Sequence, residues 1–123
     1  MRTVLIADDN ATLRRSLKAA LEAAGYSVQL ARNGAEALAL QRASAADVLI
    51  TDLFMPECDG FELIESFRKL SPRTKIVAMS GDAQRVKREY LSTAALIGVD
   101  AALKKPFRIE NLLETLRELE QRN

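Results

Sequence analysis

Five side chains that could take part in metal or phosphate chemistry follow short apolar runs of the sequence. They are the carboxylates Asp8, Asp9 and Asp52, the hydroxyl of Ser80 and the ammonium group of Lys105. Short apolar runs of this kind are typical of buried strands, and the carboxyl ends of parallel strands lie along one edge of a sheet. We therefore expect these side chains to meet although they are far apart in the sequence.

The expected cluster has the composition of a site that moves a phosphoryl group onto a carboxylate. Three crowded carboxylates repel one another, by roughly 4 kcal/mol for each pair at about 4 Å in an effective dielectric of about 20. A divalent cation relieves this repulsion, and an all-oxygen site suits Mg²⁺ better than zinc or copper. The cation and Lys105 would neutralise the transferred oxygens, Ser80 would supply a hydroxyl, and Asp52 would be the nucleophile.

The composition excludes several other kinds of chemistry. The chain has 123 residues, enough for one domain with a single core, and it has no histidine. Histidine metal sites, general bases and histidine-activated nucleophiles are therefore excluded. The net charge of +1 favours neither nucleic acid nor an anionic membrane. The single cysteine, Cys58, excludes an internal disulfide, which fits a cytoplasmic location, and we expect neither a membrane span nor a signal peptide.

Strand-like and helix-like segments alternate along the chain. Apolar runs predict strands at residues 3–7, 26–31, 48–52, 75–80 and 99–103. Apolar residues at helical spacing predict helices between Asn10 and Gly25, from Asn33 to about Arg42, from Asp59 to Ser71, over the stretch that contains Val86 and Ile97, and from Ile109 to Leu119. This alternation predicts a single α/β domain over residues 1–123, with a five-stranded parallel sheet covered by helices on both faces.

Five residues have the properties of helix ends. Asn10 and Asn33 are expected N-caps, and Glu36 stands where it would complete a capping box with Asn33. Gly25 and Gly98 are expected to end the helices before them, because glycine readily adopts the left-handed conformation that is common there.

The chain resembles the receiver domains of two-component response regulators, the CheY-like family, from end to end. The matching residues are Asp8-Asp9 after the first strand, Asp52-x-x-Met55-Pro56-x-x-Asp59-Gly60, Ser80 followed by a small residue, and Lys105-Pro106-Phe107. Each motif is weak by itself, but the four together, in order and on the expected elements, are highly specific.

The resemblance implies a role for each matching residue. Asp52 would accept the phosphoryl group, while Ser80 and Lys105 would bind phosphoryl oxygens. The Mg²⁺ ligands that it implies are Asp8, Asp9, Asp52 and the backbone carbonyl of Phe54. The resemblance also implies the doubly wound, flavodoxin-like (βα)5 fold with strand order 2-1-3-4-5, and a cis peptide bond between Lys105 and Pro106.

The resemblance further implies a signalling switch rather than a metabolic enzyme. A sensor histidine kinase or a histidine phosphotransfer protein would donate the phosphoryl group from its own histidine, since this chain has none. The receiver would catalyse only its own phosphorylation and dephosphorylation, and the added charge would reorder a local loop. A downstream protein would bind the face formed by the fourth helix, the fifth strand and the fifth helix, with no direct contact to nucleic acid or membrane.

Two details of the sequence bear on how such a switch would work. Ala102 stands three positions before Lys105, where the family usually has an aromatic ring that turns inward when the serine engages the phosphoryl group. Alanine has no rotamer to change, so we expect the signal to pass through Ser80 and the segment after it. Of the two adjacent lysines, Lys104 is expected at the surface and Lys105 in the site, because Lys105 directly precedes the proline.

Three other functions are weighed against the switch. A phosphatase of the haloacid dehalogenase type also uses an aspartate nucleophile, Mg²⁺ and a lysine, but it normally needs a second aspartate where this chain has Phe54. A nucleotide-binding module is disfavoured because the five glycines form neither a G-x-G-x-x-G nor a P-loop pattern. A pseudo-receiver that only interacts with partners would have no need of the intact acidic cluster.

Overall fold

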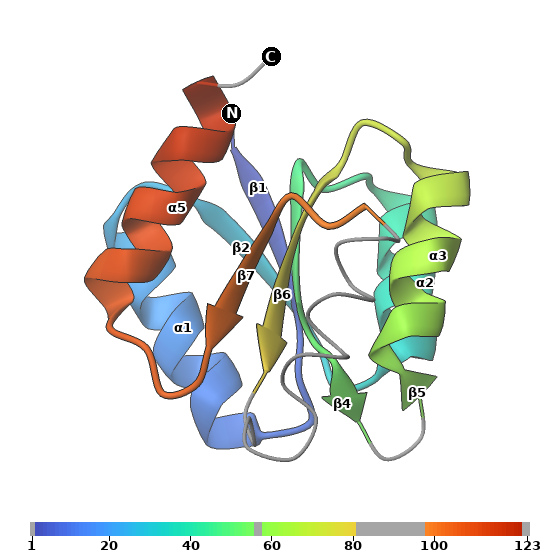
Figure 1. Cartoon of the computed structure of the whole chain (residues 1–123), viewed down its shortest axis with the longest axis horizontal. Coiled ribbons are helices and arrows are strands. Elements are labelled where there is room, and N and C mark those ends of the chain that lie inside the picture. Colours follow the sequence, from blue (N-terminus) through green and yellow to red (C-terminus); the bar gives the residue numbers. More distant parts are fainter. Residues whose placement is uncertain (1, 56–57, 81–97, 122–123) are drawn as a thin grey trace.

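A central parallel sheet lies between two layers of helices in the computed structural model of the chain (Figure 1). The structure describes residues 2–55, 58–80 and 98–121. The strands of the sheet are β1 (Thr3–Ala7), β2 (Ser27–Ala31), β3 (Val48–Asp52), β6 (Lys75–Ser80) and β7 (Ala101–Lys104). They lie in the order β2-β1-β3-β6-β7, and neighbouring strands are parallel. The expected parallel sheet and its strand order 2-1-3-4-5 are therefore confirmed.

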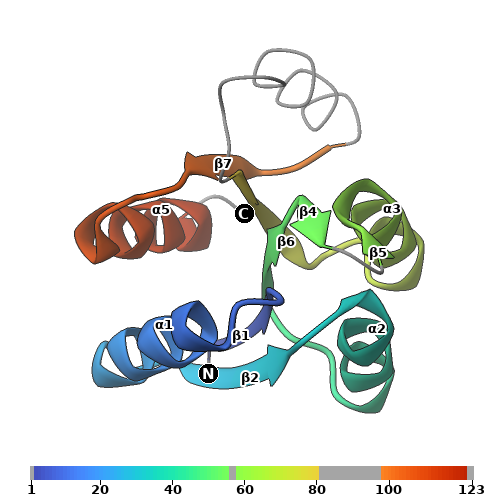
Figure 2. The same cartoon turned by 90° about the horizontal axis from the view of Figure 1, so that it is seen from below.

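Helices cover both faces of this sheet. The helices in the described part of the chain are α1 (Ala11–Ala23), α2 (Gly34–Ala43), α3 (Gly60–Leu70) and α5 (Ile109–Gln121). Figure 2 shows α1 and α5 on one face and α2 and α3 on the other. The helix expected around Val86 and Ile97 lies outside the described residues. A short antiparallel pair, β4 (Phe54–Met55) and β5 (Cys58–Asp59), follows β3, and the apolar patterns did not predict it.

Each face of the sheet buries its own apolar cluster, because successive strand residues project to opposite sides. The cluster on the side of α1 and α5 includes Ile6, Ile50, Val77, Leu17 and Leu116. The cluster on the side of α2 and α3 includes Leu5, Leu49, Ile76, Ile64 and Phe67. A slip of one residue in any strand would exchange the two sets, so the double core fixes the register in which the strand ends meet.

Asparagine side chains cap α1 and α2, as expected. The side-chain oxygen of Asn10 accepts the backbone N–H of Leu13 at 3.1 Å, and that of Asn33 accepts the N–H of Glu36 at 2.9 Å. The capping box is shifted by one residue, because the Glu36 carboxylate accepts the backbone N–H of Arg32 at 2.8 Å. That bond and the paired Arg32 guanidinium hold the pKa of Glu36 below its ordinary value.

Gly25 and Gly98 have φ angles of 97° and 85°, the left-handed conformation that glycine adopts more easily than other residues. Gly25 follows α1 directly after its C-cap residue Ala24, so the predicted end of that helix is confirmed. The helix expected before Gly98 lies outside the described residues.

The start of β7 is anchored to α3 and β6 by one ion pair. The guanidinium of Arg68 donates to the Gly98 carbonyl and lies 2.8 Å from Asp100 Oδ2. The same Asp100 oxygen accepts the backbone N–H of Ile76 at 2.8 Å. These contacts hold β7 against β6, which places the residues that follow β7 at the edge of the sheet.

A buried glutamine joins α2 to the loops at the opposite edge of the sheet. Gln41 Nε2 donates to the hydroxyls of Ser71 at 2.9 Å and Thr74 at 3.0 Å, while Gln41 Oε1 accepts the N–H of Ala46 at 2.9 Å. Both ends of the amide are therefore hydrogen-bonded, as a buried polar group requires.

Among the described helices, none has the length and apolar character needed to cross a membrane.

Candidate functional site

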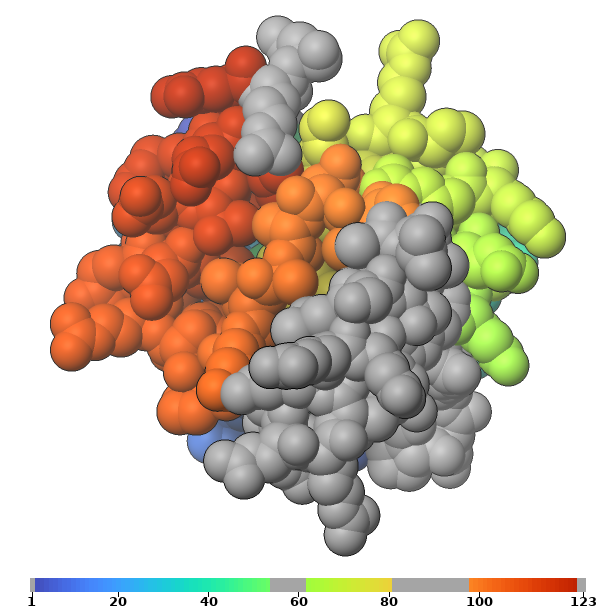
Figure 3. All heavy atoms as spheres, in the orientation of Figure 1, coloured from blue at the N-terminus to red at the C-terminus, as the bar shows by residue number. Residues whose placement is uncertain are grey.

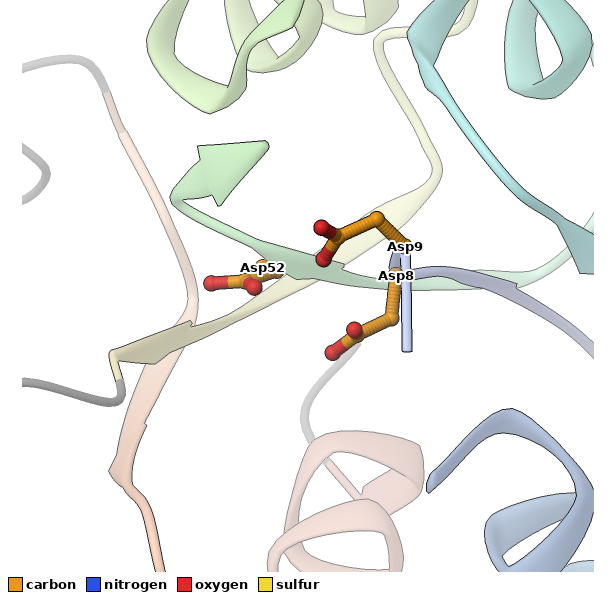
Figure 4. Close-up of side chains that lie close together, drawn as sticks. All are labelled: Asp8, Asp9 and Asp52. Atoms are coloured by element: carbon orange, nitrogen blue, oxygen red, sulfur yellow. The ribbon is translucent and has the colours of Figure 1, made fainter. Parts of the chain in front are cut away.

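The carboxyl ends of β1 and β3 bring three carboxylates together (Figure 4). One oxygen each of Asp8, Asp9 and Asp52 lies within 4.8 Å of the other two. Lys105, which follows β7, places its Nζ 2.7 Å from Asp8 Oδ2 and 3.4 Å from Asp52 Oδ2. The structure thus gathers four of the five side chains that the strand ends were expected to bring together.

Asp8 and Asp9 converge because the chain leaves the strand just before them. Successive strand residues project to opposite sides, so two neighbouring carboxylates cannot face one site while both lie in a strand. Here β1 ends at Ala7 and the chain bends at Asp9. Asp8 is fully buried, with its Oδ1 accepting the backbone N–H of Asn10 at 2.9 Å, whereas Asp9 is exposed. The bend therefore presents one buried and one exposed carboxylate to the same point.

Lys105, and not Lys104, is the lysine that reaches the carboxylates. Lys104 is exposed at the end of β7, while the side chain of Lys105 is 21% exposed and contacts Asp8 and Asp52. The Lys105–Pro106 peptide bond is cis, as the resemblance implied. Lys105 is therefore the lysine that lies beside the carboxylates, as expected, and its role in the chemistry stays a prediction.

Ser80 and Phe54 lie at the same edge of the sheet. Ser80 is the buried last residue of β6, and its carbonyl accepts the backbone N–H of Lys105 at 2.8 Å. In the register of β3 and β6, Asp52 pairs with Met79, so Ser80 is the next residue along that edge. Phe54 begins β4, two residues after Asp52, and the role of its carbonyl as a metal ligand stays a prediction.

Two other expectations concern the response of the site. Ala102 is an exposed residue of β7. Because it is an alanine, no aromatic ring stands at the position where the family usually has one. The segment that follows Ser80, through which we expect the signal to pass, lies outside the described residues.

The donor set of the cluster fits a hard divalent cation. Asp8, Asp9 and Asp52 offer only oxygen atoms, which Mg²⁺ prefers, and the exposure of Asp9 leaves room for the water ligands that Mg²⁺ usually retains. Three carboxylates carry three negative charges and Lys105 carries one positive charge. The difference is two negative charges, which a divalent cation would neutralise.

Arg14 contacts this cluster although its sequence position did not suggest it. Its Nη1 donates to the backbone carbonyl of Asp8 at 2.6 Å. The available signal was its place in α1 shortly after the two aspartates, where a long side chain can reach back over the start of the helix. Arginines in such positions usually face solvent, so the spacing alone does not identify this contact.

A groove of about 540 Å³ runs beside the carboxylates, between α1 and the segment that joins β7 to α5. Its apolar lining includes Leu13 and Leu17 of α1 and Phe107 and Ile109 near the start of α5. Lys105 also lines it, so the groove extends to the acidic cluster.

Residues 4–117 match the family of response regulator receiver domains. The chain belongs to this family. Response regulator MprA of Mycobacterium avium (strain 104) is 35% identical over 119 residues, which are 97% of this chain and 51% of that protein. MprA of Mycobacterium tuberculosis (strain ATCC 25177 / H37Ra) is also 35% identical, over 97% of this chain and 50% of that protein. This receiver thus spans about half the length of these curated relatives.

Solved receiver structures share its fold. Chemotaxis protein CheY4 of Vibrio cholerae is 34% identical, with a TM-score of 0.87 over 96% of this chain and 98% of that one. A CheY-like receiver domain protein from Methanospirillum hungatei JF-1 is 31% identical, with a TM-score of 0.90 over 97% of this chain and 93% of that one. The expected CheY-like fold and family are confirmed.

Replacing Asp9 with Asn should stabilise this receiver when divalent cations are absent. Removal of one of three mutually repelling carboxylates should raise the free energy of unfolding by about 1 kcal/mol, the scale of one Coulomb pair near 5 Å in water. Urea denaturation in EDTA measures this change, and repeating it with excess Mg²⁺ should stabilise the parent more than Asp9→Asn. Glu114→Gln, an exposed change on α5, is the control. An Asp9→Asn variant less stable than the parent in EDTA would contradict the repulsion.

Proposed function

We propose that this receiver accepts a phosphoryl group from a phosphohistidine donor onto Asp52, in a Mg²⁺-dependent reaction, and signals by the conformational change that follows. The observation that supports this most is the setting of Asp52. Its carboxylate is 9% exposed at the end of the central strand, beside two more carboxylates and the ammonium group of Lys105. Such a group is accessible to a donor yet surrounded by the charges that phosphoryl transfer needs.

In the proposed reaction, an oxygen of Asp52 attacks the phosphorus of the donor's phosphohistidine. The new O–P bond forms as the P–N bond breaks, and the neutral histidine leaves after taking up a proton. Mg²⁺, when bound, would neutralise charge on the phosphoryl oxygens. Asp8, Asp9 and Asp52 would hold it together with the carbonyl of Phe54.

Lys105 and Ser80 would bind the phosphoryl oxygens once they arrive. The Lys105 ammonium group already lies 3.4 Å from Asp52 Oδ2, so a phosphoryl group on that carboxylate would lie within its reach. The Ser80 hydroxyl stands at the neighbouring strand end and both donates and accepts hydrogen bonds. The same groups would support slow hydrolysis of the aspartyl phosphate, which makes autodephosphorylation part of the proposal.

Two alternative functions, a haloacid dehalogenase type phosphatase and an interaction-only pseudo-receiver, fit the site less well. A haloacid dehalogenase type phosphatase would need an acid two residues after the nucleophile, and this chain has Phe54 there. A receiver that only interacts would gain nothing from three carboxylates held within 4.8 Å of one another, because their repulsion is costly without a cation. The acidic cluster therefore supports a phosphorylated switch.

The donor would be a sensor histidine kinase or a histidine phosphotransfer protein, bound at the groove beside the site. The partly buried apolar residues Leu13, Phe107 and Ile109 offer a surface for the apolar face of a partner helix. Lys105 lines this groove and also contacts Asp52, so a helix bound in the groove would lie near the acceptor. A histidine on the partner helix would then lie next to the acceptor.

The downstream partner would bind on another side of the molecule. Figure 3 shows β7 and α5 (orange and red) side by side on one face, and these are the described parts of the surface expected to contact a target protein.

We also propose residues 1–123 as a single receiver domain, because the family match covers residues 4–117. A cytoplasmic location is proposed from the single cysteine and the family's phosphohistidine donors.

Incubation with acetyl phosphate should add one phosphoryl group to the parent, and only when Mg²⁺ is present. Asp52→Ala should gain none, because it lacks the accepting carboxylate. Intact-mass spectrometry measures both, and beryllofluoride binding serves as a second readout if the adduct hydrolyses quickly. If the folded parent neither gains mass nor binds beryllofluoride, the pseudo-receiver becomes the better description.

Replacing Lys105 with Ala should slow formation of the adduct by roughly a hundredfold, the usual effect of removing one group that stabilises transferring oxygens. Lys104→Ala is the matched control, because it removes the same charge from the adjacent, exposed position. Rates come from the time course of the mass shift. Equal rates for the two variants would remove Lys105 from the reaction.

Placing a long side chain in the groove should block the protein donor without affecting the small one. Ser16 is an exposed residue of α1 that lines the groove, and Ser16→Arg should reduce phosphotransfer from the phosphorylated kinase at least about tenfold, as expected for loss of a central contact. Its rate with acetyl phosphate should stay at the parent value. Ser27→Arg, the same change at an exposed position of β2 outside the groove, is the control. Unchanged transfer to Ser16→Arg would place the donor elsewhere.

A further inference from the structure

Arg14 is the charged residue that supports the backbone between the two aspartates. It lies in the first turns of α1, is partly buried, and donates from Nη1 to the carbonyl of Asp8 at 2.6 Å. We propose that Arg14 is a positioning residue of the cation site, which holds this carbonyl so that Asp8 and Asp9 both face Asp52. The inference rests on the proposed function, because it concerns the affinity of that site for Mg²⁺.

The orientation of the Asp8 carbonyl limits where Asp9 can point. It belongs to the peptide unit between Asp8 and Asp9, and because that unit is planar, fixing its oxygen also fixes the N–H and the Cα of Asp9. The chain bends at Asp9, and the pairings of β1 with the described strands end at Ala7. Strand pairing at Asp9 therefore does not set the orientation of this peptide plane. A hydrogen bond to the carbonyl therefore restricts the rotation that would turn the Asp9 carboxylate away from Asp52.

Two other contacts of the bend hold Asp8, and in the described part of the chain both involve atoms other than this carbonyl. The Asp8 N–H donates to the carbonyl of Ala31 at 3.2 Å, and Asp8 Oδ1 accepts the N–H of Asn10 at 2.9 Å. The first contact fixes the start of Asp8 and the second fixes its side chain. The bond from Arg14 completes the set at the carbonyl end of the residue.

Arg14 is itself anchored to the segment that it supports. Its backbone N–H donates to the carbonyl of Asn10 at 3.0 Å, and Asn10 caps α1 through the N–H of Leu13. The guanidinium therefore extends from a helix whose start is fixed to the bend. Hydrogen bonds from a charged donor are stronger than those from a neutral one, so this contact is well suited to hold the carbonyl.

The charge of Arg14 and its proposed role act on Mg²⁺ affinity in opposite directions. A positive charge near the site repels the cation, so its removal would tighten binding if charge were all that mattered. Loss of a group that orients a ligand weakens binding, commonly by about tenfold or more. The sign of the change in Arg14→Ala therefore separates the two effects.

The test is a Mg²⁺ titration of the unphosphorylated protein by calorimetry, with the parent, Arg14→Ala, Arg14→Gln and Arg15→Ala. Both Arg14 variants should bind Mg²⁺ about tenfold more weakly than the parent. Arg15→Ala removes the same charge from the adjacent, exposed position and should bind at least as tightly as the parent. Arg14→Gln keeps a polar side chain and decides the question if Arg14→Ala does not fold.

Each outcome bears on a different statement. Unchanged or tighter Mg²⁺ binding by a folded Arg14 variant, beside normal binding by the parent, would overturn the positioning role and leave the proposed function intact. A loss of stability in EDTA with unchanged Mg²⁺ affinity would likewise show that Arg14 is only structural. A folded parent that binds no Mg²⁺ would overturn both the inference and the cation site on which it rests.

Discussion

The repulsion among three carboxylates at one edge of the sheet is the constraint on which the rest of this structure depends. One carboxylate oxygen each of Asp8, Asp9 and Asp52 lies within 4.8 Å of the other two, and Asp8 and Asp52 are buried, where charges interact more strongly than in water. Lys105 offsets part of that repulsion through its contacts with Asp8 and Asp52. The remaining charge is suited to a divalent cation, and without one the repulsion lowers the stability of the folded chain.

A parallel sheet with a core on each face provides the rigid frame that holds these charges. Every residue of β3 is buried, and Asp52 is the last residue of this strand. The Arg68–Asp100 pair fixes the start of β7 against β6, and the bond from the Lys105 N–H to the Ser80 carbonyl joins the ends of the same two strands. The ends of β6 and β7 are therefore held together at the edge of the sheet where Ser80 and Lys105 lie.

The sequence alone predicted the five strands of the sheet, the four described helices and the meeting of four polar side chains at its edge, because each followed from local rules. Apolar runs marked the strands, Asn10, Asn33 and Gly25 marked helix ends, and the position before Pro106 distinguished Lys105 from Lys104. The fold class followed from the alternation of strands and helices, and the strand order from the resemblance to receivers. All these signals lie within a few neighbouring residues, or in motifs whose spacing is itself the signal.

The tertiary structure decided what depends on residues far apart or on side chains that could also face solvent. Gln41 lies in an alanine-rich helix with no clear apolar stripe, so its burial with Ser71 and Thr74 left no mark in the local sequence. Arg14 resembles any solvated helix arginine until the bend at Asp9 brings the Asp8 carbonyl within its reach. Spacing along the chain specifies which groups arrive at the sheet edge, whereas the packing of the chain decides which of them touch.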